Sequence, residues 1–218
     1  MMAAKKRARS GADPLIGATL GERYEIVEIL GEGGAGVVYG ARERRLGRAV
    51  AVKVLGARAP VDATAIKRFR RECVAISQLG HPSIVDVYDV GRLDDGPPYL
   101  VMPRLRGRNL AQIRREDGRF RLARVVELLA GPAAALDLVH HAGIIHRDIK
   151  PANLVLDTLP TGEEVVRIVD FGYAWLDEGA ARLTREGHVV GTARYISPEA
   201  ARGESVDRRA DVYSFACT

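Results

Sequence analysis

The segment of residues 144–156 reads IIHRDIKPANLVL and places five polar side chains within eight positions, between apolar flanks. A solvated loop needs no apolar flanks, and a core strand tolerates so many ionisable groups only when they are paired or used. Phosphoryl transfer to a hydroxyl requires a carboxylate that receives the proton, a cation at the γ-phosphate and oxygen ligands for Mg²⁺. Side chains for these three tasks are present as Asp148, Lys150, and the pair Asn153 and Asp170, the last in the string IVDFG.

A second motif is glycine-rich. The string GEGGAGVV has Gly31, Gly33 and Gly36 in the pattern G-x-G-x-x-G-x-V, between two segments with strand character. A dinucleotide-binding fingerprint opens a helix after its glycines, whereas here VVYGARE continues as a strand. A glycine loop that caps a hairpin can approach a triphosphate closely and donate backbone N–H groups to it. A simple flexible hairpin turn is the alternative interpretation.

Lys53 stands in the apolar string AVKVL. It is either an edge-strand lysine that extends to water or a lysine held among phosphates, which needs a carboxylate partner. Glu72 is a candidate partner, since it borders the helical stripe of Phe69, Cys73 and Ile76. A glutamate in that position is often only solvated, so the two residues are informative only as a pair.

These residues need elements that hold them in place. Hydrophobic periodicity predicts strands at residues 24–30, 36–43, 48–55, 84–91 and 98–105. One amphipathic helix follows the third strand, with Asp62 as N-cap and Gly80 after its end. After Gly107 we expect a helix at residues 121–141. We expect a kink at Gly131-Pro132, because an interior proline removes a helix hydrogen bond and destabilises the helix by about 3 kcal/mol. A hairpin of NLVLD and VVRIVD follows. The pattern indicates an α+β chain with a small five-stranded β lobe and a mainly helical lobe.

Bulk properties exclude several classes of protein. The 218 residues contain no apolar run long enough to span a membrane. The net charge is +5, but an arginine-rich surface explains it more simply than nucleic-acid binding does. Two cysteines, Cys73 and Cys217, lack zinc spacing and suit a reducing cytoplasm. The basic start MMAAKKRARSGAD has no apolar core and reads as a disordered tail.

Taken together and in this order, the motifs resemble a eukaryotic-type (Hanks-type) protein serine/threonine kinase of the sort found in bacteria. The resemblance implies a two-lobe kinase-like fold, with a tail at 1–20, an N-lobe at 21–106 and a partial C-lobe at 107–218. It implies ATP and Mg²⁺ or Mn²⁺ as cofactors, and protein substrates that include the kinase itself. It does not imply a nucleic-acid partner. The alternative is a non-catalytic kinase-like scaffold or nucleotide-binding remnant.

The resemblance also assigns roles. Asp148 is the catalytic base, Lys150 neutralises the γ-phosphate, and Asn153 and Asp170 hold the metal. Lys53 holds the α/β-phosphates and pairs with Glu72. The residues expected around ATP are Gly31, Glu32, Gly33, Gly36, Val38, Ala51, Lys53, Met102 as gatekeeper, Pro103 through its carbonyl and Leu105 through its N–H. Arg106 departs from the family pattern, which often has an acidic group near the ribose.

The segment between DFG and SPE resembles an activation loop. Thr192 in GTARY is expected to contact the catalytic base and the substrate hydroxyl, and together with Lys150 it favours serine/threonine specificity. Thr184 is either an autophosphorylation site whose phosphate pairs with Arg147 or an ordinary loop threonine.

The family's larger lobe continues past the final string DVYSFACT. Asp211 in that string resembles the residue that anchors the HRD backbone. We therefore expect this chain to be a C-terminally truncated fragment of a longer kinase, unstable and weakly active as written, with apolar residues exposed near its end. The expected location is the cytoplasm, with any membrane anchor in a longer parent protein.

Overall fold

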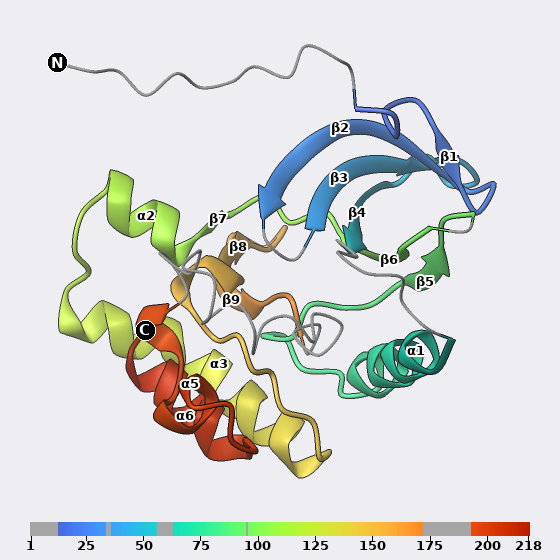
Figure 1. Ribbon diagram of the computed structural model, residues 1–218. Helices are drawn as coiled ribbons and strands as arrows, with labels where there is room; N and C mark the ends of the chain where they lie inside the picture. The colour runs from blue at the N-terminus through green and yellow to red at the C-terminus, as the bar shows by residue number, and fades with distance from the viewer. Residues whose placement is uncertain (1–12, 34–35, 56–62, 95, 172–192) are drawn as a thin grey trace, which may run out of the picture.

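The computed structural model describes residues 13–33, 36–55, 63–94, 96–171 and 193–218 (Figure 1). Within these ranges, six strands form one antiparallel sheet in the order β1-β2-β3-β4-β6-β5. The strands are β1 (Thr19–Leu20), β2 (Tyr24–Gly33), β3 (Gly36–Glu43), β4 (Ala49–Leu55), β5 (Asp89–Arg92) and β6 (Pro98–Pro103). The expected sheet had five strands. The sixth strand, β1, was not predicted, because two residues are too short to show a periodicity.

The start of the sheet lies earlier than the sequence indicated. Residues 13–20 were assigned to the tail, yet Leu20 is buried and pairs with Tyr24. The carboxylate of Asp13 accepts a hydrogen bond of 3.0 Å from the Tyr39 hydroxyl. The β lobe therefore includes residues 13–20.

Strand β4 has a buried core on both of its faces. Val50, Val52 and Val54 belong to one hydrophobic cluster, while Ala51 and Leu55 belong to clusters on the other face. Because side chains alternate along a strand, Lys53 falls on the same face as Ala51 and Leu55. This face of β4 is directed toward the helical lobe.

Helix α1 (Ala63–Ser77) covers part of that face. Its Phe69 and Cys73 pack with Leu55 and Leu100, and Ile76 is also buried, so the predicted apolar stripe is confirmed. The expected N-cap, Asp62, lies outside the described residues. Residues 84–91 are predicted as one strand. The observed strand is shorter, because the first part of this segment turns toward the helical lobe.

The second lobe is assembled from helices around a small sheet (Figure 1). Strand β7 (Arg108–Asn109) pairs with β8 (Leu154–Thr158), which pairs with β9 (Glu164–Ile168). The helices are α2 (Leu110–Glu116), α3 (Leu122–His141), α5 (Pro198–Ala201) and α6 (Arg208–Ala216), with 3-10 turns η1 (Pro151–Asn153) and η3 (Ala193–Tyr195). The hairpin predicted from NLVLD and VVRIVD is confirmed.

Helix α3 continues through Gly131 and Pro132 as a single element. A Cβ at Gly131 would lie 2.5 Å from the Ser83 hydroxyl oxygen, so the helix approaches the β lobe closely at this point. Pro132 is buried. Close packing and burial of the proline ring supply the local reason for a residue that otherwise weakens a helix.

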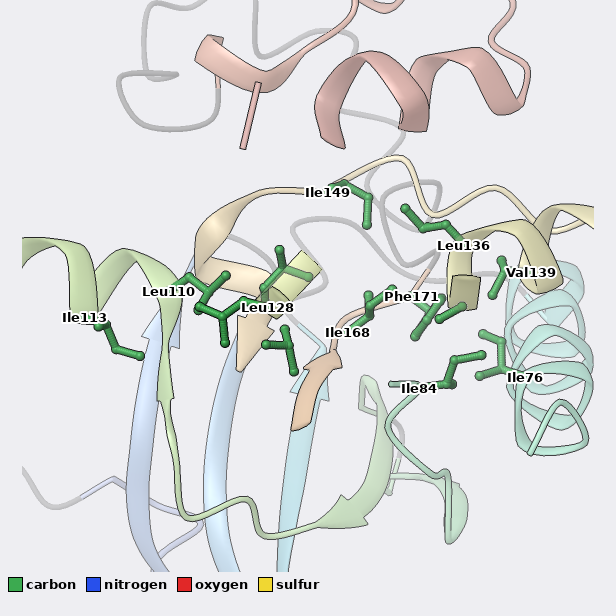
Figure 2. Close-up of a cluster of buried hydrophobic side chains, with 13 residues drawn as sticks. Ile76, Ile84, Leu110, Ile113, Leu128, Leu136, Val139, Ile149, Ile168 and Phe171 are labelled. Atoms are coloured by element: carbon green, nitrogen blue, oxygen red, sulfur yellow. The ribbon is translucent and has the colours of Figure 1, made fainter. Parts of the chain in front are cut away.

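A buried hydrophobic cluster forms the core of the helical lobe and reaches the β lobe at Ile76 and Ile84 (Figure 2). It extends from Ile76 on α1 and Ile84 through Phe171 to Leu110 on α2. Ile149, between two polar residues of the segment 144–156, is 1% exposed and points into this cluster. Ile149 inside the polar segment and Leu154 in its apolar flank therefore anchor the segment to the core.

Some apolar side chains remain on the surface. Val212 and Tyr213 on α6 are 59% and 42% exposed, as expected near the end of the chain. No helix within the described ranges has the length and apolar character needed to cross a membrane.

Candidate active site

Asp148, Lys150 and Asn153 form one hydrogen-bonded group after α3. The ammonium of Lys150 lies 2.8 and 2.7 Å from the two carboxylate oxygens of Asp148. The Nδ2 atom of Asn153 donates to the backbone oxygen of Asp148 at 2.7 Å and to its Oδ2 at 2.9 Å. Two independent donors therefore fix the orientation of the Asp148 carboxylate, which is what a positioned base requires.

The backbone that carries Asp148 is held from a distant element. Asp211 on α6 is fully buried, and its Oδ2 and Oδ1 accept hydrogen bonds from the backbone N–H groups of His146 and Arg147 at 2.8 and 2.7 Å. The Nε2 atom of His140 on α3 also lies 2.8 Å from Oδ2. Arg147 has φ of +66°, a left-handed conformation that costs about 1–3 kcal/mol without glycine. Asp211 is thus one of the contacts that maintain this strained turn, and its predicted anchoring role is confirmed.

His146 is a structural residue. Its side chain is fully buried, its ring centroid lies 4.8 Å from that of Phe171, and Nδ1 accepts the N–H of Asp148 at 3.2 Å. Nε2 lies 3.0 Å from the carbonyl oxygen of Val169, so the ring must donate there. Burial lowers the pKa of His146, chiefly through desolvation, which keeps the ring neutral. The imidazole therefore connects the Asp148 backbone to the strand end that leads to Asp170.

His140 and His141 differ in role. A histidine in the last turn of a helix can complement the helix end. His141 is exposed and contacts the Asp137 carbonyl, so it does so. The side chain of His140 instead points inward to the buried carboxylate of Asp211 and is only 6% exposed.

The second half of the site combines Lys53 and Asp170. The Lys53 ammonium lies 2.7 Å from Oδ1 of Asp170, although the two residues come from different lobes. The lysine side chain is 3% exposed, so it is not the edge-strand lysine considered from the sequence. Asp170 has φ of +64°, the second strained non-glycine residue of the site. Strain of this kind is concentrated at functional sites.

A hydrophobic cluster adjoins this ion pair. Val38, Ala51, Met102 and Leu105, all expected around ATP, pack in one cluster with Val85 and Val169. Val85 and Val169 were not found from the sequence, because nothing in an isolated valine marks it as part of a pocket. Pro103 follows Met102 at the end of β6.

The glycine-rich hairpin is formed by the ends of β2 and β3, where Gly33 pairs with Gly36. Gly36 has φ of 130°, which favours glycine. Gly31 and Gly33 are different, since an added Cβ would meet no described atom within 4 Å and neither has a positive φ. The fold itself does not require glycine at these two positions. Glu32, between them, is exposed.

Other predicted residues are placed less completely. Glu72 is half-buried on α1 between Phe69 and Cys73, and its pairing with Lys53 stays a prediction. The side chain of Arg147 is exposed. Thr184 and Thr192 lie outside the described residues.

The oxygen atoms near Asp170 suit a hard divalent cation. The Asn153 amide nitrogen is bound to Asp148, which leaves the amide oxygen to serve as a ligand. Together with the Asp170 carboxylate it provides the oxygen donors that Mg²⁺ prefers. In the part of the chain that the structure describes, no group of three or more His, Cys, Asp or Glu gathers to hold a metal. A cation here would need phosphate or water oxygens as well.

Comparison with known proteins decides the family. A family model described as "Protein kinase domain" matches residues 24–218. The chain belongs to this protein kinase family. It is 45% identical over 201 residues to the serine/threonine-protein kinase PknB of Mycobacterium leprae. The aligned region covers 91% of this chain and 32% of that protein. PknB of Mycobacterium tuberculosis gives the same identity and coverage over 202 residues. The chain thus spans about a third of the length of these curated relatives.

Solved structures agree with this assignment. The kinase domain of Mycobacterium tuberculosis PknI superimposes with a TM-score of 0.70 at 30% identity, over 92% of this chain and 73% of that one. The predicted two-lobe protein kinase fold, with a β lobe and a partial helical lobe, is therefore confirmed.

Proposed function

We propose that this kinase domain transfers the γ-phosphate of ATP to serine and threonine hydroxyls of proteins, including its own. The observation that carries the proposal is that two polar groups from different parts of the fold are linked, because the N–H of Val169, next to Asp170, donates to the carbonyl oxygen of Asn153 at 3.0 Å. One is the Asp148–Lys150–Asn153 group, and the other is the Lys53–Asp170 ion pair at 2.7 Å. Family membership adds weight, since the named relatives are serine/threonine-protein kinases.

The nucleotide would lie between the β lobe and the Asp170 loop. The cluster of Val38, Ala51 and Met102 offers an apolar surface for adenine. Gly31 and Gly33 leave space that a Cβ would fill, so backbone N–H groups could approach phosphates. The nearly buried ammonium of Lys53 supplies a fixed positive charge for the phosphate oxygens.

The reaction needs little covalent chemistry from the protein, so positioning is the main contribution. Asp148 accepts the proton of the attacking hydroxyl, and Asn153 keeps its carboxylate in place. Lys150 neutralises charge on the transferred group, for which its ammonium moves from Asp148 toward the phosphate. A divalent cation held by Asn153 and Asp170 would screen the negative charge of the phosphates. A cytoplasmic location provides ATP and keeps Cys73 and Cys217 reduced.

Regulation belongs to the same proposal. Phosphorylation of Thr184 would add an anion that the exposed Arg147 can bind with charge-assisted hydrogen bonds. Thr192 would contact the acceptor hydroxyl. Both roles follow from the family resemblance alone.

The test combines nucleotide-dependent thermal shift with transfer of labelled phosphate to a casein-like protein. We expect Mg²⁺-ATP to raise Tm, and Asp148→Asn to lower the transfer rate by about 10²–10⁴-fold. The matched control is Asp137→Asn, a 75% exposed carboxylate on α3, which should leave the rate unchanged. A thermal shift without transfer would favour a non-catalytic scaffold. No shift and no transfer would contradict the proposal.

A further inference from the structure

Two stretches of chain lie between the lobes next to the candidate nucleotide site. The first, here called the hinge, is residues 103–107 and leads from β6 into β7. The second, here called the rear crossing, is residues 82–85, which belong to the chain between α1 and β5 of the β lobe and contact the helical lobe. The rear crossing binds β9 through its backbone, with Ile168 N–H donating to Ser83 O at 2.8 Å and Val85 N–H donating to Ile168 O at 3.1 Å. It is therefore held against the β8–β9 hairpin.

The hinge reaches β8 at very close range. A Cβ at Gly107 would lie 1.6 Å from the carbonyl oxygen of Leu156, so only glycine fits there. The chain then continues into β7, where Arg108 pairs with Leu156. The lower end of the hinge is thus fixed to β8 by shape and by strand pairing.

One carboxylate on β8 joins the two stretches. Oδ1 of Asp157 accepts the backbone N–H of Arg106 in the hinge at 3.3 Å. Oδ2 accepts a hydrogen bond of 3.2 Å from Nε of Arg167 on β9. Nη1 of Arg167 in turn donates to the carbonyl oxygen of Pro82, in the rear crossing, at 3.0 Å. The Asp157 and Arg167 side chains are only 13% and 16% exposed. A pair this well covered and this well hydrogen-bonded is more than a solvated surface bridge.

We propose that Asp157, acting with Arg167, is a positioning residue that sets the place of the hinge relative to the rear crossing. Arg106 is the residue after Leu105, whose N–H is expected to bind adenine. The rear crossing carries Val85, which belongs to the cluster around Met102. By holding both stretches, the carboxylate fixes the spacing between the backbone and apolar parts of the adenine site. The inference rests on the proposed nucleotide binding.

The competing explanation is local. The pair could stabilise only the β8–β9 hairpin, with no effect on the hinge. In that case Asp157→Ala would lower Tm but leave nucleotide affinity and hinge exchange unchanged.

The first measurement is amide hydrogen exchange in the nucleotide-free chain. Asp157→Ala should speed exchange in the segments that cover the hinge and the rear crossing, because the Arg106 N–H loses its acceptor and Arg167 loses its partner. The control is Glu164→Gln, which removes an ion pair with Arg124 from the same β9 strand but does not touch either stretch. Unchanged protection of the hinge in Asp157→Ala would overturn the inference whatever the chain does with ATP.

The second measurement is titration with a non-hydrolysable ATP analogue and Mg²⁺. We expect Asp157→Ala to raise Kd by about five- to tenfold, since one hydrogen bond to a charged group is lost at the hinge. Asp157→Asn keeps an oxygen for Arg106 and should restore most of the affinity. Glu164→Gln should stay within about twofold of wild type because its ion pair is exposed.

A double-mutant cycle completes the test. Arg167→Met and Asp157→Ala act on one connection, so their combined effect on Kd should be smaller than the product of the separate effects. Independent effects would contradict the proposal. If Asp157→Ala does not fold, Arg167→Met carries both measurements, and Asp157→Asn serves as the variant expected to stay close to wild type. If wild type binds no nucleotide, the proposed function fails, whereas the exchange result still decides the role of Asp157.

Discussion

Replacing Asp211 by alanine should remove most phosphoryl transfer while leaving nucleotide binding nearly intact. The carboxylate is 0% exposed and accepts hydrogen bonds from three groups, the N–H groups of His146 and Arg147 and the Nε2 of His140. The alanine variant leaves all three donors without this acceptor. None of the three belongs to the Lys53–Asp170 pair or to the adenine cluster.

The size of the effect follows from burial. A buried donor without a partner costs about 1–3 kcal/mol, and His146 and His140 are both buried in this way. Arg147 is an exposed residue and the hydrogen bond of its N–H is only partly buried, so the loss there should be smaller. The free energy of unfolding should therefore fall by about 3–5 kcal/mol, as is typical when one partner of a buried charged network is removed. Relaxation of the strained turn at Arg147 would then move Asp148, and a displacement of about 1 Å can lower a rate about 10²-fold.

The assay measures three quantities on the same preparations: urea unfolding, Kd for an ATP analogue, and the rate of phosphate transfer at saturating ATP. Val212→Ala is the matched control, because Val212 is the next residue on α6 and is 59% exposed. Asp211→Asn keeps one acceptor oxygen and should fall between wild type and alanine in stability. A folded Asp211→Ala protein with an unchanged rate would refute the anchoring argument. An equal loss of affinity and rate would show that the network reaches the nucleotide site as well.

Two further predictions concern stability. Gly107→Ala should lower the free energy of unfolding by about 3 kcal/mol or more, because its Cβ would lie 1.6 Å from the Leu156 carbonyl oxygen. The control Gly31→Ala, whose Cβ meets no described atom, should lower it by about 1 kcal/mol or less, and equal losses in urea unfolding would contradict this. The pKa of His146 is lowered from its ordinary 6.5, so below pH 6.5 the unfolded chain binds more protons than the folded one. The free energy of unfolding should then decrease as pH falls below 6.5, by up to about 1.4 kcal/mol per pH unit, and this decrease should be smaller in His146→Asn but persist in the exposed control His141→Asn.

The polar segment 144–156 could be recognised from the sequence because its residues act locally. Asp148, Lys150 and Asn153 lie within six positions, and each touches another in the structure. The α1 stripe was predicted for a similar reason, since periodicity reports which face of a helix is buried. Short elements were missed. Helix α2 has only seven residues and little periodicity, although its capping box of Asn109 and Gln112 was a readable signal.

Contacts across long stretches of sequence were less accessible. The inward orientation of His140 depends on Asp211, 71 positions later, and periodicity contains no information on such a pair. The same holds for the bond between Arg106 and Asp157, which becomes visible only when the hinge lies on β8. The path of residues 84–91 also depended on tertiary contacts, since Ile84 pairs with Ile168 instead of continuing β5.

The reach of Asp211 has a consequence for the order of events during translation. Most of the β lobe pairs with near neighbours in sequence, so its hairpins can close while the chain is still emerging from the ribosome. The N–H of His146 must wait for an acceptor made 65 residues later. A nascent chain therefore completes its glycine hairpin well before the backbone that carries Asp148 is anchored, so the group of Asp148, Lys150 and Asn153 is secured late in synthesis.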